Sequence, residues 1–421
     1  MIKVFELYPG ITLRCFPDDR FKQGCLTVGL VSPMRQETAA LNALLPAVLL
    51  RGSVSTPDLR AITLKLDDLY GASVGAVARR VGDYQCVGLS CNFIADHYAL
   101  AGDKVLEPML QYVRELLLEP LLENGVFRAD FVESEKKNLA ANIAAQRNDK
   151  RAYCSEQMFR KLCQNDSYSI PRLGDIASVK AITPESLYDN YKNLLKTARI
   201  ELFYVGHGDP EQIAALAKEM FRGIDRCYVN LPKQTALTPV NAGSFTESLE
   251  ISQGKLCMGF TTPINFRNGN FAALQLANVI FGGGMTSKLF MNVREKMSLC
   301  YDIGSGYYTG KGILTVNAGI DWDKAELVQQ EVLTQLDAVC RGDFTDEELE
   351  AARSALLSSL KKTCDTVGSI EGYYATAALS GHPYTPEVYM SVLEKITREE
   401  IMEVAKTVKL DTVYLLKGVE A

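Results

Sequence analysis

Three histidines are the first residues of this chain whose side chains could do acid–base or metal chemistry. They are His97, His207 and His382, and none stands three or four residues from another His or from a Cys. A zinc site built from one local His/Cys cluster is therefore not expected. The sequence also offers no Cys/His pair whose spacing predicts a nucleophile and its base. We interpret His97 and His207 as turn residues.

A glycine triplet, Gly282–Gly284, could in principle cradle a phosphate group. A phosphate-binding loop of that kind ends in Gly-Lys-Ser/Thr, whereas Lys288 here follows Ser287. The triplet is better explained by close backbone approach in a turn. Two hydrogen-bond donors follow it, Arg294 and Tyr301. Their spacing alone favours structural roles, with Arg294 as a solvated helix-end cation and Tyr301 as a half-buried core aromatic residue.

The 11 cysteines are scattered from Cys15 to Cys364 without a Cys-x-x-Cys motif. This pattern is typical of reduced thiols in a cytosolic protein. Cys86 and Cys91, the closest pair, lie in a predicted strand, so we expect them to act as small buried hydrophobic residues.

The composition restricts the class of protein. The chain has 421 residues, 47% of them hydrophobic and 23% charged, with a formal net charge of −6. This predicts a globular protein of two or three domains. The acidic excess argues against nucleic acid as a partner. No run approaches 18 apolar residues and the N-terminal segment lacks a signal-peptide pattern, so we expect no membrane partner and a cytoplasmic location.

An internal repeat organises the elements that must position these residues. Thr183 and Thr397, which lie 214 residues apart, each cap an amphipathic helix that leads into an apolar strand. Phe131 and Phe344, which lie 213 residues apart, each stand where a further helix opens. Two matches at nearly one offset predict a duplicated architecture.

Strand and helix patterns alternate within each half. Alternating apolar residues predict strands over 84–92 and 313–319, and a 3.6-residue period predicts a helix with one apolar face over 105–117. The fold class is therefore α+β. Pro232, Pro239 and Gly243 interrupt the periodicity, so we predict a linker at 230–243 between a first half, 1–229, and a second half, 244–421.

The segment from Phe281 to Tyr308 resembles the second-half signature of the M16 (pitrilysin-like, inverzincin) peptidase family. In that family a glycine-rich turn precedes a helix that ends in Arg-Glu-Lys, and a Tyr follows seven residues after the Arg. Arg294 and Tyr301 match these positions. The resemblance implies that this pair positions the substrate and supports the developing oxyanion. It also implies two LuxS/MPP-like halves, each a mostly antiparallel sheet packed with helices, that form a clamshell.

The first half lacks the zinc chemistry of that family. An inverzincin carries His-x-x-Glu-His on a helix, together with a distant Glu as the third ligand. Alignment on the apolar-Arg-Gly run that follows the motif, and on a later Glu-Lys pair, places four other residues at these positions: Ala43, Pro46, Ala47 and Asn142. We therefore expect no metal, no cofactor and no catalytic residue in this chain. Pro46 also predicts a kinked or late-starting helix, because proline costs about 3 kcal/mol in a helix interior.

The resemblance implies a noncatalytic subunit. We expect Arg294 and Tyr301 to serve a zinc-bearing M16 paralogue in a heterodimer, although a homodimer is the alternative, and we expect a peptide or protein substrate. The first half is similar to a noncatalytic subgroup of Gram-positive bacteria that is named for association with 5-aminopentanol modification of elongation factor P. An accessory role in that modification is therefore implied.

Two other classes of function stay open. One is a peptide-binding or scaffold protein with no part in proteolysis, for which replacing Arg294 or Tyr301 would change only affinity. The other is an independent hydrolase with a different nucleophile, which the scattered cysteines and histidines do not favour. The charged run Arg147–Arg151 is typical of a solvated helix end.

Overall fold

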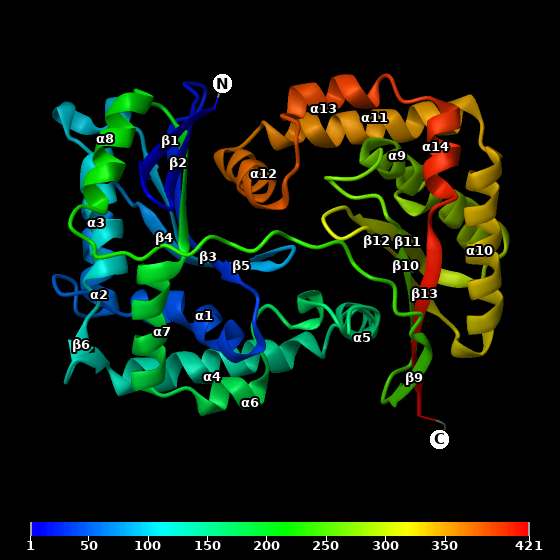
Figure 1. The fold of residues 1–421 in the computed structure, drawn as a ribbon, viewed down its shortest axis with the longest axis horizontal. Coiled ribbons are helices and arrows are strands. Elements are labelled where there is room, and N and C mark those ends of the chain that lie inside the picture. Colours follow the sequence, from blue (N-terminus) through cyan, green and yellow to red (C-terminus); the bar gives the residue numbers. More distant parts are fainter. Residues whose placement is uncertain (1, 420–421) are drawn as a thin grey trace. The chain divides into compact units, whose positions relative to one another are not determined.

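The computed structural model describes residues 2–419 and divides into two compact units (Figure 1). Unit 1 comprises the residues up to 144 together with 170–233 and 364–376, and unit 2 comprises 145–169, 234–363 and the residues from 377 onward. Each unit therefore contains a segment that the sequence-based division at 230–243 places in the other half. Residues 224–242 carry no helix or strand.

Unit 1 contains a six-stranded sheet. Its strand order is β1 (Lys3–Tyr8), β2 (Ile11–Pro17), β8 (Arg199–Gly206), β3 (Gln23–Pro33), β5 (Tyr84–Ile94) and β4 (Ser73–Val81). All neighbours pair antiparallel except β2 and β8, which are parallel. A short hairpin, β6 (Leu122–Glu123) and β7 (Val126–Phe127), stands apart from this sheet.

Unit 2 contains a five-stranded sheet of the same design. Its order is β11 (Cys300–Tyr308), β12 (Ile313–Ile320), β10 (Gly254–Thr261), β13 (Lys409–Gly418) and β9 (Gly243–Leu249). Here too only one pair, β9 with β13, is parallel. When the strand order is read from β4 in unit 1 and from β11 in unit 2, equivalent strands occur in the same order. This confirms the predicted repeat and the α+β class.

Equivalent helices follow equivalent strands. The first half of the sequence carries α1 (Gln36–Leu49), α2 (Leu59–Asp68), α3 (Leu106–Leu118), α4 (Ala129–Gln146), α5 (Lys150–Leu162), α6 (Ile176–Ala181), α7 (Pro184–Thr197) and α8 (Pro210–Met220). The second half carries α9 (Phe271–Gly282), α10 (Ala325–Arg341), α11 (Asp346–Thr363), α12 (Val367–Ser380), α13 (Pro386–Leu393) and α14 (Arg398–Ala405). A π-helical segment, Leu289–Lys296, follows α9.

The two units exchange equivalent helices. In unit 2, α5 packs on one face of the sheet through Met158 and Leu162, together with Cys257 of β10. Gly259 permits this approach, because a Cβ there would lie 2.4 Å from the sulfur of Met158. In unit 1, most of α12 is included, and its Tyr374 ring lies 5.5 Å from the ring of Phe16 in β2. Each unit is thus completed by a helix from the other half of the sequence.

The main core of unit 1 lies on the opposite face of its sheet. Side chains of a strand alternate between the two faces, and Leu26, Val28 and Leu30 of β3 all belong to the core cluster beneath α1, α3 and α7. The predicted apolar face of 105–117 is confirmed: the residues buried there are Val105, Met109, Leu110, Tyr112, Val113, Leu116 and Leu117, and Leu106 is partly buried. Cys86 and Cys91 are buried free thiols, as expected.

Candidate functional site

The glycine triplet connects α9 to the π-helical segment by a close backbone approach. A Cβ on Gly282 would lie 2.7 Å from side-chain atoms of Leu289 and Ser305, and one on Gly283 would lie 2.7 Å from the Cα of Val279. Gly284 has open space at that position. The first two glycines are therefore required by packing, and the third is not.

Arg294 lies in the π-helical segment, and 39% of its side chain is exposed. Its guanidinium carbon lies 4.6 Å from the ring centroid of Phe290, within cation–π distance. Its Nε lies 3.7 Å from the carboxylate of Glu295, which is too long for a hydrogen bond. Single π-helical turns occur frequently at functional sites. The guanidinium makes no hydrogen bond within residues 2–419, so it can donate to a bound molecule.

Tyr301 is the extra residue of a β-bulge in β11, since Cys300 pairs with Ile320 and Asp302 with Gly319. Bulges often re-aim a side chain, and 55% of Tyr301 is exposed. Its hydroxyl donates a 2.7 Å hydrogen bond to Oδ1 of Asp321. This bond raises the pKa of Tyr301 and lowers that of Asp321. The phenol therefore stays protonated and remains a donor at neutral pH.

Charged residues lie near the start of β11, where Cys300 is half-buried. The pKa of the Cys300 thiol is raised to about 11, chiefly by burial and also by the charge of Asp302, while the nearby charge of Arg294 opposes the rise. Arg151 of α5, part of the charged run that we expected to be solvated, lies 3.4 Å from Asp302. In the described chain no hydrogen bond or ion pair joins Arg294 to Tyr301, so each has partners of its own.

The zinc-motif positions of the first half lie on α1 and α4. Ala43 and Ala47 are half-buried on α1, Pro46 is buried inside the same helix, and Asn142 is exposed on α4. Zinc takes thiolate, imidazole or carboxylate ligands, and none of these four side chains supplies one. The residues present therefore do not fit the zinc ion of the active peptidases. Within residues 2–419, no group of three or more His, Cys, Asp or Glu residues is placed to hold a metal ion.

A buried amide network lies next to these positions. Asn42 donates to Oε1 of Gln85 at 2.9 Å and accepts from Nδ2 of Asn190 at 2.8 Å. Gln85 donates in turn to the carbonyl of Ala39 at 3.0 Å. The network ties α1 to β5 and α7, and its buried donors and acceptors are paired. Sequence reasoning missed it, because single amides at unrelated positions carry no pairing signal.

Two histidines meet in unit 1. The ring centroids of His97 and His207 lie 4.3 Å apart, and Nε2 of His207 lies 3.6 Å from a carboxylate oxygen of Asp19. Both line a pocket of about 540 Å³ that begins where β5 and β8 end. His207 stands between Gly206 and Gly208, whose φ angles are +147° and +140°. The turn assignment was therefore reasonable for His207, but the contact between the two rings was not predictable from residues this far apart in sequence.

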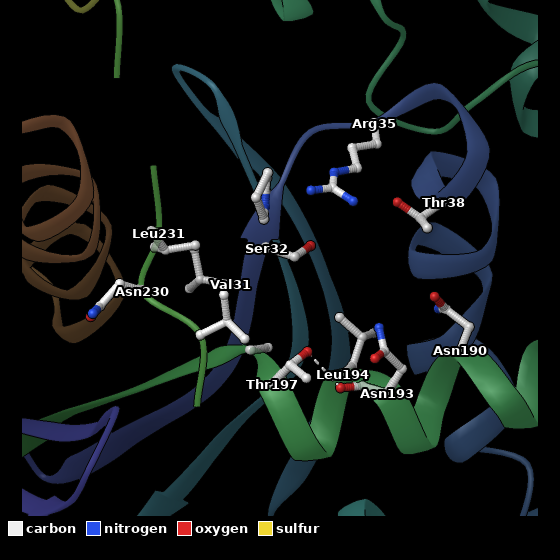
Figure 2. Close-up of a pocket in the computed structure, with 13 residues that line it drawn as sticks. Val31, Ser32, Arg35, Thr38, Asn190, Asn193, Leu194, Thr197, Asn230 and Leu231 are labelled. Atoms are coloured by element: carbon white, nitrogen blue, oxygen red, sulfur yellow. Dashed lines mark hydrogen bonds between the residues drawn. The ribbon is translucent and has the colours of Figure 1, made fainter. Parts of the chain in front are cut away.

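A second pocket of unit 1, of about 280 Å³, lies between the end of β3, the start of α1, α7 and the segment 229–231 (Figure 2). It contains none of the residues that the sequence analysis singled out. Within residues 2–419, no helix combines the length and the apolar character needed to cross a membrane.

A duplicated α+β fold whose zinc positions carry no zinc ligand defines an inactive metalloprotease. The family model "Peptidase M16 inactive domain" matches residues 181–356. The chain is 30% identical over 411 residues to the probable inactive metalloprotease YmfF of Bacillus subtilis (strain 168), with 98% of this chain and 96% of that protein covered. The chain therefore belongs to the M16 peptidase family, as a noncatalytic member.

Solved structures share the fold of this chain. A conserved protein from Enterococcus faecalis V583 superimposes with a TM-score of 0.92 at 28% identity, and the match covers 99% of each chain. The M16 inactive domain from Pseudomonas fluorescens gives a TM-score of 0.82 at 21% identity and covers 100% of this chain and 98% of that one. The second likeness concerns the fold alone.

Proposed function

We propose that this chain is the noncatalytic subunit of a heterodimeric M16-type zinc peptidase, and that Arg294 and Tyr301 position the substrate for a zinc-bearing paralogue. The observation that carries the proposal is a division of chemistry within one chain. None of the zinc-motif positions carries a zinc ligand. In contrast, Arg294 and Tyr301 are exposed hydrogen-bond donors that follow the glycine triplet in the sequence. Both lie on unusual backbone, Arg294 in a π-helical segment and Tyr301 at a β-bulge.

The two donors suit an acyl-transfer reaction. A guanidinium presents up to five N–H groups and a phenol one O–H group, and both can bind a peptide carbonyl or the oxyanion that develops from it. Arg294 can donate without losing a hydrogen bond, whereas Tyr301 must exchange Asp321 for the substrate. Removing one donor of an oxyanion site typically lowers the rate about 10²–10³-fold. Cleavage itself takes place on the partner.

The test is peptide cleavage by this protein, by a zinc-bearing paralogue and by their mixture. We expect chelator-sensitive cleavage only in the mixture, and we expect Arg294→Ala to lower its rate about 100-fold without weakening assembly. Arg341→Ala is the matched control, because Arg341 is an exposed arginine of unit 2 whose partner is Asp337 on the same helix. Wild-type turnover by the Arg294→Ala mixture, in a complex that has assembled, would refute the role of Arg294.

A scaffold function is the second candidate, and the same assay separates it. If the mixture forms a complex that cleaves nothing, and Arg294→Ala changes only the affinity for peptide, the chain binds peptides without taking part in proteolysis. If the chain forms only a homodimer in light scattering and never joins the paralogue, the heterodimer is refuted.

We extend the proposal to an accessory role in elongation factor P modification. It is supported by the similarity of the first half to the subgroup named for that modification. Deleting the gene should leave elongation factor P without its 5-aminopentanol group, which the intact mass of the purified factor measures. A fully modified factor in the deletion strain would contradict the role and would leave the peptidase proposal untouched.

A further inference from the structure

The pocket of Figure 2 is a separate concave site in unit 1 with an uneven lining. Polar side chains reach it from the start of α1 and from α7: Arg35 and Thr38 lie on one side, and Asn190 and Asn193 on the other. The rest of the lining comes from the end of β3, from α7 and from the segment 229–231, and most of it is apolar. Its apolar residues are Val31, Pro33, Leu194, Ala198, Val229 and Leu231, and its polar residues are Ser32, Thr197 and Asn230.

Arg35 gives the pocket its charge. It is the single charged residue among the 13 that line the pocket. Its side chain is exposed, and within residues 2–419 it forms neither an ion pair nor a hydrogen bond. The Thr38 hydroxyl and the Asn193 amide are likewise without side-chain hydrogen bonds in this part of the chain. The lining thus combines the unpaired guanidinium of Arg35 with the side chains of Thr38 and Asn193, which have no side-chain hydrogen bond. This combination of groups is complementary to an anion.

The apolar wall restricts what kind of anion fits. An inorganic anion would leave Pro33, Val229 and Leu231 in contact with water, since these are the apolar residues of the lining that are partly or fully exposed. A hydrocarbon tail would cover them. The size of the pocket sets the length of that tail. A water-sized group occupies about 30 Å³, so about 280 Å³ holds roughly nine non-hydrogen atoms. An unbranched monocarboxylate with about seven or eight carbons, the carboxyl carbon included, has about this size.

We propose that this pocket binds a free monocarboxylate of medium chain length. The carboxylate accepts hydrogen bonds from the guanidinium of Arg35 and the hydroxyl of Thr38, and the hydrocarbon chain lies against the partly exposed Pro33 and Leu231. The site is independent of the proposed peptidase function, since it shares no residue with Arg294, Tyr301 or the zinc-motif positions.

The first test is a chain-length series measured by isothermal titration calorimetry on the full chain. The probes are butyrate, hexanoate, octanoate and dodecanoate. Each added methylene should raise the affinity about fourfold while it still finds apolar wall, and the gain should stop near eight carbons. Affinity that keeps rising to dodecanoate would indicate surfactant-like binding to the surface and would overturn the proposal. Absence of any octanoate binding at millimolar concentration would also overturn it.

The second test separates the charge from the tail. Octanamide has the same shape as octanoate without the charge, and it should bind about tenfold more weakly, since a hydrogen bond to a charged group is the stronger kind. Arg35→Gln should lower octanoate affinity about tenfold and leave octanamide affinity unchanged. Arg60→Gln is the matched control, because Arg60 is an exposed arginine of the same unit outside the pocket.

Thr38→Val provides a second variant that keeps the charge. It should weaken octanoate binding about threefold to tenfold through the lost hydroxyl. Equal binding of octanoate and octanamide by the wild-type protein, or unchanged octanoate binding by Arg35→Gln, would show that Arg35 does not recognise the carboxylate and would refute the proposal.

Discussion

Replacing Glu371 by alanine should release α12 from unit 1. Glu371 lies on α12, is only 3% exposed, and accepts two hydrogen bonds from the guanidinium of Arg79 on β4, at 2.8 and 2.9 Å. The two residues are 292 positions apart in the sequence. This bidentate pair is the best-defined polar contact between the exchanged helix and the sheet of unit 1, so its loss should affect α12 more than any other element.

The size of the effect follows from burial. A hydrogen bond to a charged group contributes about 1.5–3 kcal/mol, and removing one member of a fully buried ion pair costs about 3–5 kcal/mol. Because the side chain of Arg79 is 35% exposed, water can solvate the guanidinium after the change, which lowers the cost. We therefore expect a loss of about 2 kcal/mol in the local stability of α12, a factor of about 30 in its opening equilibrium.

Hydrogen exchange followed by mass spectrometry measures this opening directly. Peptides from α12 should exchange about 30-fold faster in Glu371→Ala than in the wild type, whereas peptides from α10 should not change. Asp337→Ala is the control, since Asp337 and Arg341 form an exposed pair one helical turn apart on α10, and such pairs contribute only about 0.2–0.5 kcal/mol. An acceleration of α12 below threefold would show that Arg79 and Glu371 do not hold the helix in place.

Three further outcomes can be measured on the same protein. Gly282→Ala places a Cβ within 2.8 Å of neighbouring side chains and should lower the free energy of unfolding by about 1–3 kcal/mol. Gly284→Ala should leave the free energy of unfolding unchanged or slightly raised. Equal effects of the two substitutions in urea denaturation would contradict the packing argument. Asn42→Ala leaves the buried amide of Asn190 without its acceptor and should cost about 2–4 kcal/mol in the same assay, so a loss under 1 kcal/mol would refute the importance of the network. Burial lowers the pKa of His382 below its usual value of 6.5. The neutral imidazole therefore contributes to the stability of the fold above about pH 6.5, and this contribution is lost as the pH falls. The free energy of unfolding of His382→Phe should depend less on pH between 7 and 5 than that of the wild type, and an unchanged pH profile would argue against this assignment.

Local patterns in the sequence predicted local structure well. The capping box at Thr397 and Glu400 is present with both of its hydrogen bonds, because it involves groups only three residues apart. The segments 84–92 and 313–319, predicted to be strands, lie in β5 and β12. Both strands are buried on both faces over most of their length, so the one-sided burial that strict alternation indicates is not what the structure shows.

Contacts between distant residues were not predictable in this way. Nothing in the composition of α5 or α12 indicates which sheet each helix covers, because both sheets offer similar apolar faces. The pairing of Arg79 with Glu371 and the contact of His97 with His207 depend on that choice and on loop paths. The positions of Arg294 and Tyr301 came from a motif, but their partners Glu295, Phe290 and Asp321 became known only from the structure.

The exchange of helices also has a consequence for synthesis on the ribosome. The sheet of unit 1 is complete once β8 has been synthesised, at Gly206. The part of α12 that belongs to unit 1, with the partners of Arg79 and Phe16, ends at residue 376. At about 5–20 residues per second, roughly 7–30 s pass between the last first-half residue of unit 1, Lys233, and that point. During this interval Arg79 and Phe16 lack their partners Glu371 and Tyr374 in the nascent chain. A truncated message that ends after the first half would therefore yield a unit 1 without α12, in which Arg79 and Phe16 never acquire these partners.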